Sequence, residues 1–154
     1  MRYAIKFAYD GLNYHGFARQ PNLSTIESKL IEILLDKKLI RDIKSSQFRY
    51  ASRTDKKVSA LGNVIAFNSE SNEKDIKNKI LIQFKDIIIY GYSKVPIDFF
   101  PRYAKQRHYR YFIEIKSLDD EKILNAVKIF EGEHNFSNFA RLETNKNPIR
   151  TIDH

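Results

Sequence analysis

A single carboxylate among cations is the first feature of the sequence that could do chemistry. Asp55 follows Arg53 by two residues and precedes Lys56 and Lys57, on a polar stretch between two apolar runs. Each neighbouring positive charge favours the ionised form of the acid, so the spacing predicts an anionic Asp55. Such a group suits a carboxylate nucleophile, or an acid that meets a flipped base. A solvated turn with a local ion pair has the same spacing and is the commoner case, so the spacing alone leaves both interpretations open.

Basic and aromatic residues interleave in two further stretches. They are Tyr14, His15, Phe17, Arg19 and Gln20 in 12–23, and Arg102, Tyr103, Lys105, Arg107, His108, Tyr109 and Arg110 in 102–110. Such mixtures suit base stacking and phosphate contact. A loop packed down by its own aromatic rings explains the first stretch equally well. Tyr109 stands at the entrance of an expected strand, where it is either a core tyrosine or a ring with its hydroxyl near a cleft.

The overall charge supports a polyanionic partner. The 154 residues carry a net charge of +8 and a pI of about 9.6, which favours nucleic acid first and an anionic membrane surface second. No apolar run approaches the roughly 20 residues that span a bilayer, so we expect no membrane span. The absence of cysteine removes disulfides and thiolate metal sites and fits a reducing compartment such as the cytoplasm.

The elements that must position these residues alternate between strand and helix periodicity. We expect strands at 2–9, 47–51, 63–68 and 87–95, with helices at 24–38 and 73–84. Ser24 and Glu27 form an expected capping box for the first helix. Strand, helix, strand, strand, helix, strand is the ferredoxin-like split βαβ order, an α+β fold whose antiparallel sheet carries both helices on one face. We assign this N-terminal domain to residues 1–100, with Asp55 on its loop between two strands.

Residues 101–154 predict the beginning of a second α+β domain. We expect a strand at 109–115, a helix capped by Asp119 or Asp120, and a strand from Pro148. The inward face of that helix is expected to comprise Ile123, Ala126, Val127 and Phe130. Gly132 is expected to close the helix, and two phenylalanines to pin a turn at 133–139. This unit is incomplete as a sheet, so apolar surface should be exposed where further strands would pack.

Four groups of residues, each weak alone, follow one another along the chain. They are Tyr9-Asp10-Gly11 with Tyr14-His15-Gly16-Phe17 and Arg19-Gln20; Arg53-Thr54-Asp55; Arg107-His108-Tyr109-Arg110-Tyr111; and Gly132-Glu133-His134-Asn135-Phe136 with Pro148-Ile149-Arg150-Thr151-Ile152. In this order and approximate spacing they resemble the tRNA pseudouridine synthase A family, over nearly all of the chain.

The resemblance implies a tRNA pseudouridine synthase, an isomerase that converts uridine to pseudouridine on the 3′ side of the anticodon stem-loop. It places the catalytic aspartate at Asp55, the arginine that assists base flipping at Arg53, and the tyrosine that packs on the target base at Tyr109. It implies tRNA as partner, homodimer formation, and no cofactor or metal. For contacts with the RNA backbone we expect Arg19, Arg102, Lys105 and Arg107.

The sequence departs from the family pattern in two respects. Ser52 and Ser59 stand where glycine and histidine are usual, and Lys57 stands where glycine is usual. The lysine demands a loop backbone that accepts a β-carbon. The family pattern also continues beyond the matched stretch, so we expect either a fragment, whose activity alone would be doubtful, or an unusually short member.

Two other functions fit parts of the sequence. A non-catalytic RNA-binding module on a ferredoxin-like sheet predicts exposed aromatic residues on the sheet and an indifferent Asp55. A globular interaction domain with incidental basic charge predicts neither. The ordered motifs favour the enzyme.

Overall fold

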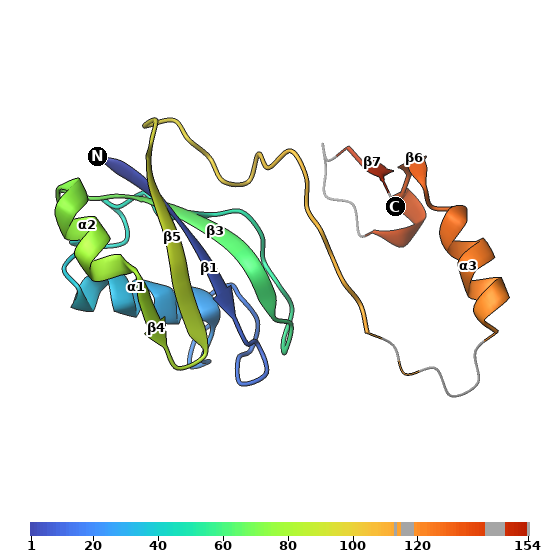
Figure 1. Cartoon of the computed structure of the whole chain (residues 1–154), viewed down its shortest axis with the longest axis horizontal. Coiled ribbons are helices and arrows are strands. Elements are labelled where there is room, and N and C mark those ends of the chain that lie inside the picture. Colours follow the sequence, from blue (N-terminus) through green and yellow to red (C-terminus); the bar gives the residue numbers. More distant parts are fainter. Residues whose placement is uncertain (113, 115–118, 141–146, 154) are drawn as a thin grey trace. The chain divides into compact units, whose positions relative to one another are not determined.

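The chain folds into two compact units, Met1–Arg107 and His108–His154. A computed structural model describes residues 1–112, 114, 119–140 and 147–153 (Figure 1). The elements are helices and antiparallel strands, which confirms the predicted α+β class. None of the described helices has both the length and the apolar character that crossing a membrane requires.

The first unit is built on one antiparallel sheet of five strands, in the order β2-β3-β1-β5-β4. The strands are β1 (Arg2–Tyr9), β2 (Arg49–Tyr50), β3 (Ala60–Asn68), β4 (Ile82–Phe84) and β5 (Ile87–Val95). Central β1 pairs with β3 on one side and β5 on the other. The strand order and the helices α1 (Ile26–Asp36) and α2 (Glu73–Ile80) form the predicted ferredoxin-like arrangement.

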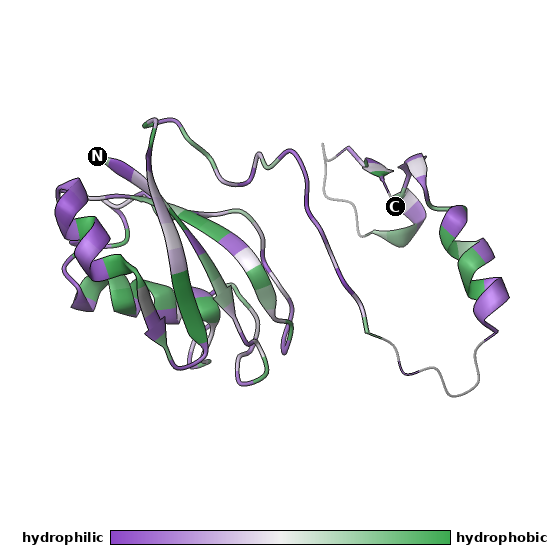
Figure 2. Cartoon of the chain, viewed as in Figure 1, coloured by the Kyte–Doolittle hydropathy of each residue, from purple (hydrophilic) through white to green (hydrophobic). Residues whose placement is uncertain are grey.

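The core lies between the sheet and the two helices. Alternate side chains of β1, from Tyr3 through Phe7 to Tyr9, are buried, as period-two patterning predicts. They join one cluster with Leu30 and Leu34 of α1 and with side chains of α2. Figure 2 shows apolar residues along α1 and in the strands, whereas most of α2 is polar. The burial of one helical stripe and one strand face confirms the main predicted elements.

Helix α1 begins one residue later than predicted. Thr25, not Ser24, is the N-cap, and Ser28 completes the capping box. The Thr25 hydroxyl accepts a hydrogen bond from the Ser28 amide, and the Ser28 hydroxyl accepts one from the Thr25 amide. Glu27 is therefore released from the capping role, and its carboxylate accepts a hydrogen bond from the Arg19 amide instead.

The second helix is shorter than predicted, and a strand was missed. Helix α2 ends at Ile80, where Leu81 has an extended backbone, and β4 pairs with β5 as a hairpin. Lys85, in the connecting turn, has a φ of 44°. Pairing with β5 gives these residues hydrogen-bonded partners that a longer helix would not supply. Strand β2 is also shorter than the predicted 47–51, and Gln47 lies outside it with a φ of 45°.

The second unit contains α3 (Asp120–Lys128), β6 (Gly132–Asn135), the 3₁₀ turn η1 (Ser137–Phe139) and β7 (Ile149–Ile152). Strands β6 and β7 pair antiparallel, and Asp119 caps α3 as predicted. The predicted strand at 109–115 is wrong for Tyr109–Phe112 and Glu114, which have no regular structure; Ile113 and Ile115 lie outside the described residues. Among the described residues, none of α3 is buried, so the predicted inward face is not a core; Ile123 is half-buried, and Phe130, which follows the helix, contacts Phe136 and Phe139.

Candidate functional site

The loop that carries Asp55 is held against the loop that follows β1. The Phe17 amide donates to the Thr54 carbonyl oxygen at 2.9 Å, and the Lys57 amide donates to the Tyr14 carbonyl oxygen at 3.3 Å. The Tyr9 and Thr54 hydroxyls share a hydrogen bond of 2.8 Å. Burial raises the pKa of the Tyr9 hydroxyl, and its hydrogen bonds offset part of this shift. Asp55 thus lies on a loop anchored on both sides.

Two glycines allow these loops to approach closely. A β-carbon on Gly11 would lie 2.1 Å from the carbonyl oxygen of Val58, a distance that real β-carbons do not reach. Gly16 has a φ of 90°, and a β-carbon there would lie 3.0 Å from the Thr54 carbonyl oxygen. The glycines in the Tyr9–Phe17 motif therefore shape the wall beside Asp55.

Lys57, in the Asp55 loop, has an unfavourable backbone conformation. Its φ is 66°, in the left-handed region that favours glycine. The loop therefore keeps this backbone conformation although Lys57 has a β-carbon, at a cost of roughly 1–2 kcal/mol. Strained residues of this kind concentrate at functional loops.

A pocket of about 540 Å³ opens between the two loops. It is lined by His15, Gly16, Phe17, Ala18, Gln20, Leu23, Arg53, Thr54, Asp55 and Lys56. Asp55, Arg53 and Lys56 are exposed at its edge, and His15 has a buried Nδ1 without a hydrogen-bond partner among the described residues. The structure therefore brings the predicted catalytic pair, Asp55 and Arg53, together with Lys56 and the rings of His15 and Phe17.

Among the described residues, Asp55 forms no ion pair with the cations that neighbour it in the sequence. In the described part of the chain, no ion pair within 4.0 Å joins Asp55 to Arg53, Lys56 or Lys57, so the local ion pair of the alternative interpretation is not formed. The Asp55 carbonyl oxygen accepts the Val58 amide, which closes the turn. The carboxylate is thus open to a ligand, and the nearby positive charges are available for an anionic one.

Arg107 contacts the same loop from the end of the first unit. Its Nε donates to the Ser52 hydroxyl at 3.0 Å, and one terminal nitrogen donates to the carbonyl oxygens of Arg102 at 2.6 Å and Ala51 at 3.4 Å. The guanidinium therefore ties the 102–107 segment to the residues just before Arg53. Its predicted contact with RNA stays a prediction.

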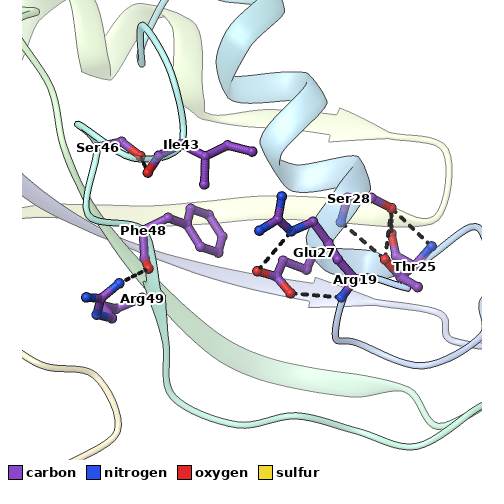
Figure 3. A network of polar contacts seen from close by, with 8 residues as sticks. All are labelled: Arg19, Thr25, Glu27, Ser28, Ile43, Ser46, Phe48 and Arg49. Carbon is purple, nitrogen blue, oxygen red and sulfur yellow. Dashed lines mark hydrogen bonds and ion pairs between the residues drawn. The ribbon is translucent and has the colours of Figure 1, made fainter. Parts of the chain in front are cut away.

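Arg19 and Arg102 line a different pocket, of about 560 Å³. The other cations in that lining are Lys44 and Arg49, which the sequence analysis did not single out. Figure 3 shows the paired Arg19 and Glu27 beside α1, and Phe48 with Arg49 across from them. The sequence held one signal for these additional cations: the basic-aromatic pair Arg49-Tyr50 directly before the Asp55 loop.

The last two predicted residues lie outside both pockets. Lys105 is exposed on the segment between Arg102 and Arg107. Tyr109 belongs to the second unit, where its side chain is 69% exposed, so it is not a core tyrosine there. Both roles stay predictions. Among the described residues, no three His, Asp or Glu side chains gather closely enough to hold a metal ion.

The fold and the pocket together describe a basic α+β protein that presents a free carboxylate on an anchored loop. No protein-family model matches the chain. Three curated relatives are tRNA pseudouridine synthase A from Thermococcus sibiricus (46% identical over 154 residues), Methanobrevibacter smithii (44% over 154 residues) and Pyrococcus furiosus (41% over 156 residues). Each match covers 99% of this chain, but 58%, 52% and 56% of the respective relative.

Over nearly its whole length, the chain is similar to proteins named tRNA pseudouridine synthase A. It spans about half the length of the curated relatives it matches. The resemblance inferred from the ordered motifs is thus confirmed.

Proposed function

We propose that this chain forms the Asp55-bearing part of a tRNA pseudouridine synthase that isomerises uridine in the anticodon arm. Its similarity to relatives of that name over 99% of its length supports the reaction. The single structural observation that carries the proposal is the exposed, unpaired carboxylate of Asp55 in a pocket with Arg53 and Lys56.

The reaction is balanced within the substrate. The N1–C1′ bond breaks, the uracil turns, and a C5–C1′ bond forms; C5 then loses a proton and N1 gains one. Asp55 assists either by adding to the base at C6 or by attacking or stabilising C1′. In both routes the carboxylate is regenerated, so no external oxidant, reductant or group donor is consumed.

The cations have a separate role in reaching the base. A uridine within a stem or stacked loop must leave its neighbours before it meets Asp55, at a cost of a few kcal/mol. Arg53 is suited to occupy the vacated space or to hold the adjacent phosphate, since it lines the same pocket as Asp55. Arg19, Arg102, Lys105 and Arg107 are proposed to contact the RNA backbone further along.

The remaining parts of the proposal concern the whole protein. Tyr109, with its exposed ring, is proposed to pack on the freed uracil. The functional protein is proposed to act in the cytoplasm as a homodimer that holds one tRNA. An RNA-binding module without catalysis would not need Asp55, so product formation distinguishes the two functions.

The test uses unmodified tRNA transcripts and maps pseudouridine by chemical adduct formation and primer extension. We would assay this chain alone and a hybrid in which it replaces the matching stretch of the Thermococcus sibiricus relative. The hybrid is expected to form pseudouridine in the anticodon arm. A folded hybrid that binds tRNA but leaves every uridine unchanged would contradict the proposal and favour the binding module.

A further inference from the structure

The pocket beside the Asp55 loop has the chemistry of a nucleotide-binding site, which goes beyond the backbone contacts proposed for Arg19 and Arg102. We call it the arginine pocket and define it by Arg19, Lys44, Arg49 and Arg102, with Phe48 and Tyr50 among its aromatic lining. Its volume of about 560 Å³ lies within the roughly 300–1,000 Å³ typical of small-ligand sites. All of these residues belong to the first unit.

One arginine of the pocket is fixed in place by a largely buried carboxylate. Glu27 accepts a hydrogen bond from the Arg19 amide at 2.9 Å, and its other oxygen lies 3.5 Å from Arg19 Nε. Only 11% of the Glu27 side chain is exposed, compared with 48% for Arg19. Because Glu27 holds Nε, the terminal nitrogens of Arg19 remain available to a ligand.

The other three cations have no carboxylate to balance them. In the described part of the chain, no ion pair is formed by Lys44, Arg49 or Arg102. Arg49 donates to the Phe48 carbonyl oxygen at 2.9 Å, which restricts its side chain without neutralising it. Burial, and then the charge of Arg49, lower the pKa of the neighbouring Arg2 guanidinium. This positive surplus would be relieved by an anion.

Aromatic groups give the pocket a surface for a flat ring. Phe48 lines the pocket and is largely buried, and Tyr50 packs edge-on against Phe17 at 5.1 Å between ring centroids. Phe100 lines the pocket beside Arg102. Cations with aromatic rings are the combination that binds unpaired nucleotides, because phosphate and base each find a partner.

The arginine pocket adjoins the site of the proposed chemistry. Arg49 and Tyr50 run directly into the loop of Arg53 and Asp55, and the six residue steps from Arg49 to Asp55 span at most about 22 Å. Residues 15–18 and Gln20 line the Asp55 pocket, while Arg19 lines the arginine pocket. An RNA strand with one nucleotide at Asp55 therefore reaches Arg49 with a nucleotide a few positions further along the strand.

We propose that the arginine pocket binds one unpaired nucleotide of the substrate RNA strand, close to the uridine that reaches Asp55. Its phosphate contacts Lys44, Arg49, Arg102 and the free nitrogens of Arg19, and its base lies against the aromatic lining. This deepens the proposed function and rests on it for the identity of the strand. The consequence is that the enzyme grips single-stranded RNA beside the target.

The test measures the affinity of the intact 154-residue chain for a fluorescently labelled uridine pentamer by anisotropy, over a range of salt concentrations. The double variant Lys44→Ala/Arg49→Ala removes two exposed pocket cations. It is expected to bind at least tenfold more weakly. The slope of log affinity against log salt should fall by about 1.4, since each lost phosphate contact on single strands contributes about 0.7.

The matched control is Lys74→Ala/Lys77→Ala, which removes two exposed lysines from α2. It is expected to stay within about twofold of the parent chain. Equal losses in both double variants would overturn the proposal, because binding would then follow net charge rather than the pocket. Retained circular dichroism spectra exclude unfolding as the cause of a loss.

Further comparisons distinguish an RNA strand from a free nucleotide as the ligand, and nucleotide binding from catalysis. Uridine monophosphate alone is expected to bind far more weakly than the pentamer; equal affinity would overturn an RNA strand as the ligand. If pocket-dependent binding is found but the hybrid forms no pseudouridine, the proposed function fails while the nucleotide site stands. If pseudouridine forms without pocket-dependent binding, this inference alone fails.

Discussion

The two units contain similar amphipathic helices and bury them very differently. In the first unit, Ile26, Leu30 and Leu34 of α1 are at most 1% exposed. In the second, Leu124 and Val127 of α3 are 63% and 54% exposed. A periodic apolar stripe therefore predicts a helix in both places but a core in only one. Local sequence therefore determines that a helix forms, whereas the burial of its apolar face depends on what the helix packs against.

The Asp55 loop is intermediate between the buried helix α1 and the exposed helix α3. It has few buried side chains, and hydrogen bonds to the loop after β1 hold it in place. The comparison therefore orders the expected effects of substitutions. Losses should be largest in the sheet core, intermediate in the loop contacts, and smallest in the second unit.

The largest effect on stability is expected from Phe7→Ala. Phe7 is fully buried in β1, so truncation should cost about 3–5 kcal/mol of the free energy of unfolding through lost burial and a residual cavity. Chemical denaturation followed by circular dichroism measures it. The matched variant Phe139→Ala, at a side chain 72% exposed in the second unit, should cost less than about 1 kcal/mol. Similar costs would erase the contrast between the units.

Tyr9→Phe should have an intermediate effect that depends on pH. Loss of the hydrogen bond to Thr54 should cost about 1 kcal/mol near neutrality. Burial raises the folded-state pKa of Tyr9 above its unfolded value near 10. The native state then holds the proton longer, so this stability is complete below about pH 10 and is lost as the pH rises through the folded-state pKa.

The variant should therefore lose stability less steeply than the parent chain above pH 10. Denaturant unfolding at pH 7 to 11 measures the slope. Tyr103→Phe, at a tyrosine 84% exposed, should leave the slope unchanged. An equally steep alkaline loss in Tyr9→Phe would show that Tyr9 does not titrate as its burial requires.

Lys57→Gly should have a smaller effect than Tyr9→Phe, and in the opposite direction. Glycine removes the cost of the left-handed backbone at this position, so the chain should gain about 0.5–1 kcal/mol after the entropy of the unfolded glycine is deducted. Lys56→Gly, next to it without that strain, should instead lose about 0.5–1 kcal/mol. Thermal unfolding measures the stability of both variants. A loss of stability in both would show that the backbone of Lys57 is not strained.

Much of the first unit could be predicted from the sequence because its signals agree at every level. The alternation in β1 and the stripe of α1 each match the side that is buried. Strand β4 could not be predicted, because Ile82–Phe84 continues the helical period and becomes a strand only by pairing with β5. The cap of α1 failed by one residue, because Glu27 finds Arg19 across a loop.

The candidate site was predictable in its residues but not in its contacts. Arg53 and Asp55 were indicated by their spacing, and they do share a pocket. Nothing local indicates that Arg107 donates to Ser52 across the chain, or that Lys44 and Arg49 join Arg19. These contacts depend on how separate segments fold together, which composition and periodicity do not encode.

The most direct test of the account compares Asp55→Asn with Asp36→Asn in the hybrid enzyme. Asp36 is an exposed aspartate at the end of α1, so its variant loses the same charge away from the pocket. Pseudouridine formation and tRNA affinity would be measured for both. We expect Asp55→Asn to reduce the rate by at least about 10³-fold, or about 4 kcal/mol of barrier, with tRNA affinity nearly unchanged, and Asp36→Asn to resemble the parent. Turnover by Asp55→Asn at the parent rate would contradict the assignment of Asp55 as the catalytic carboxylate.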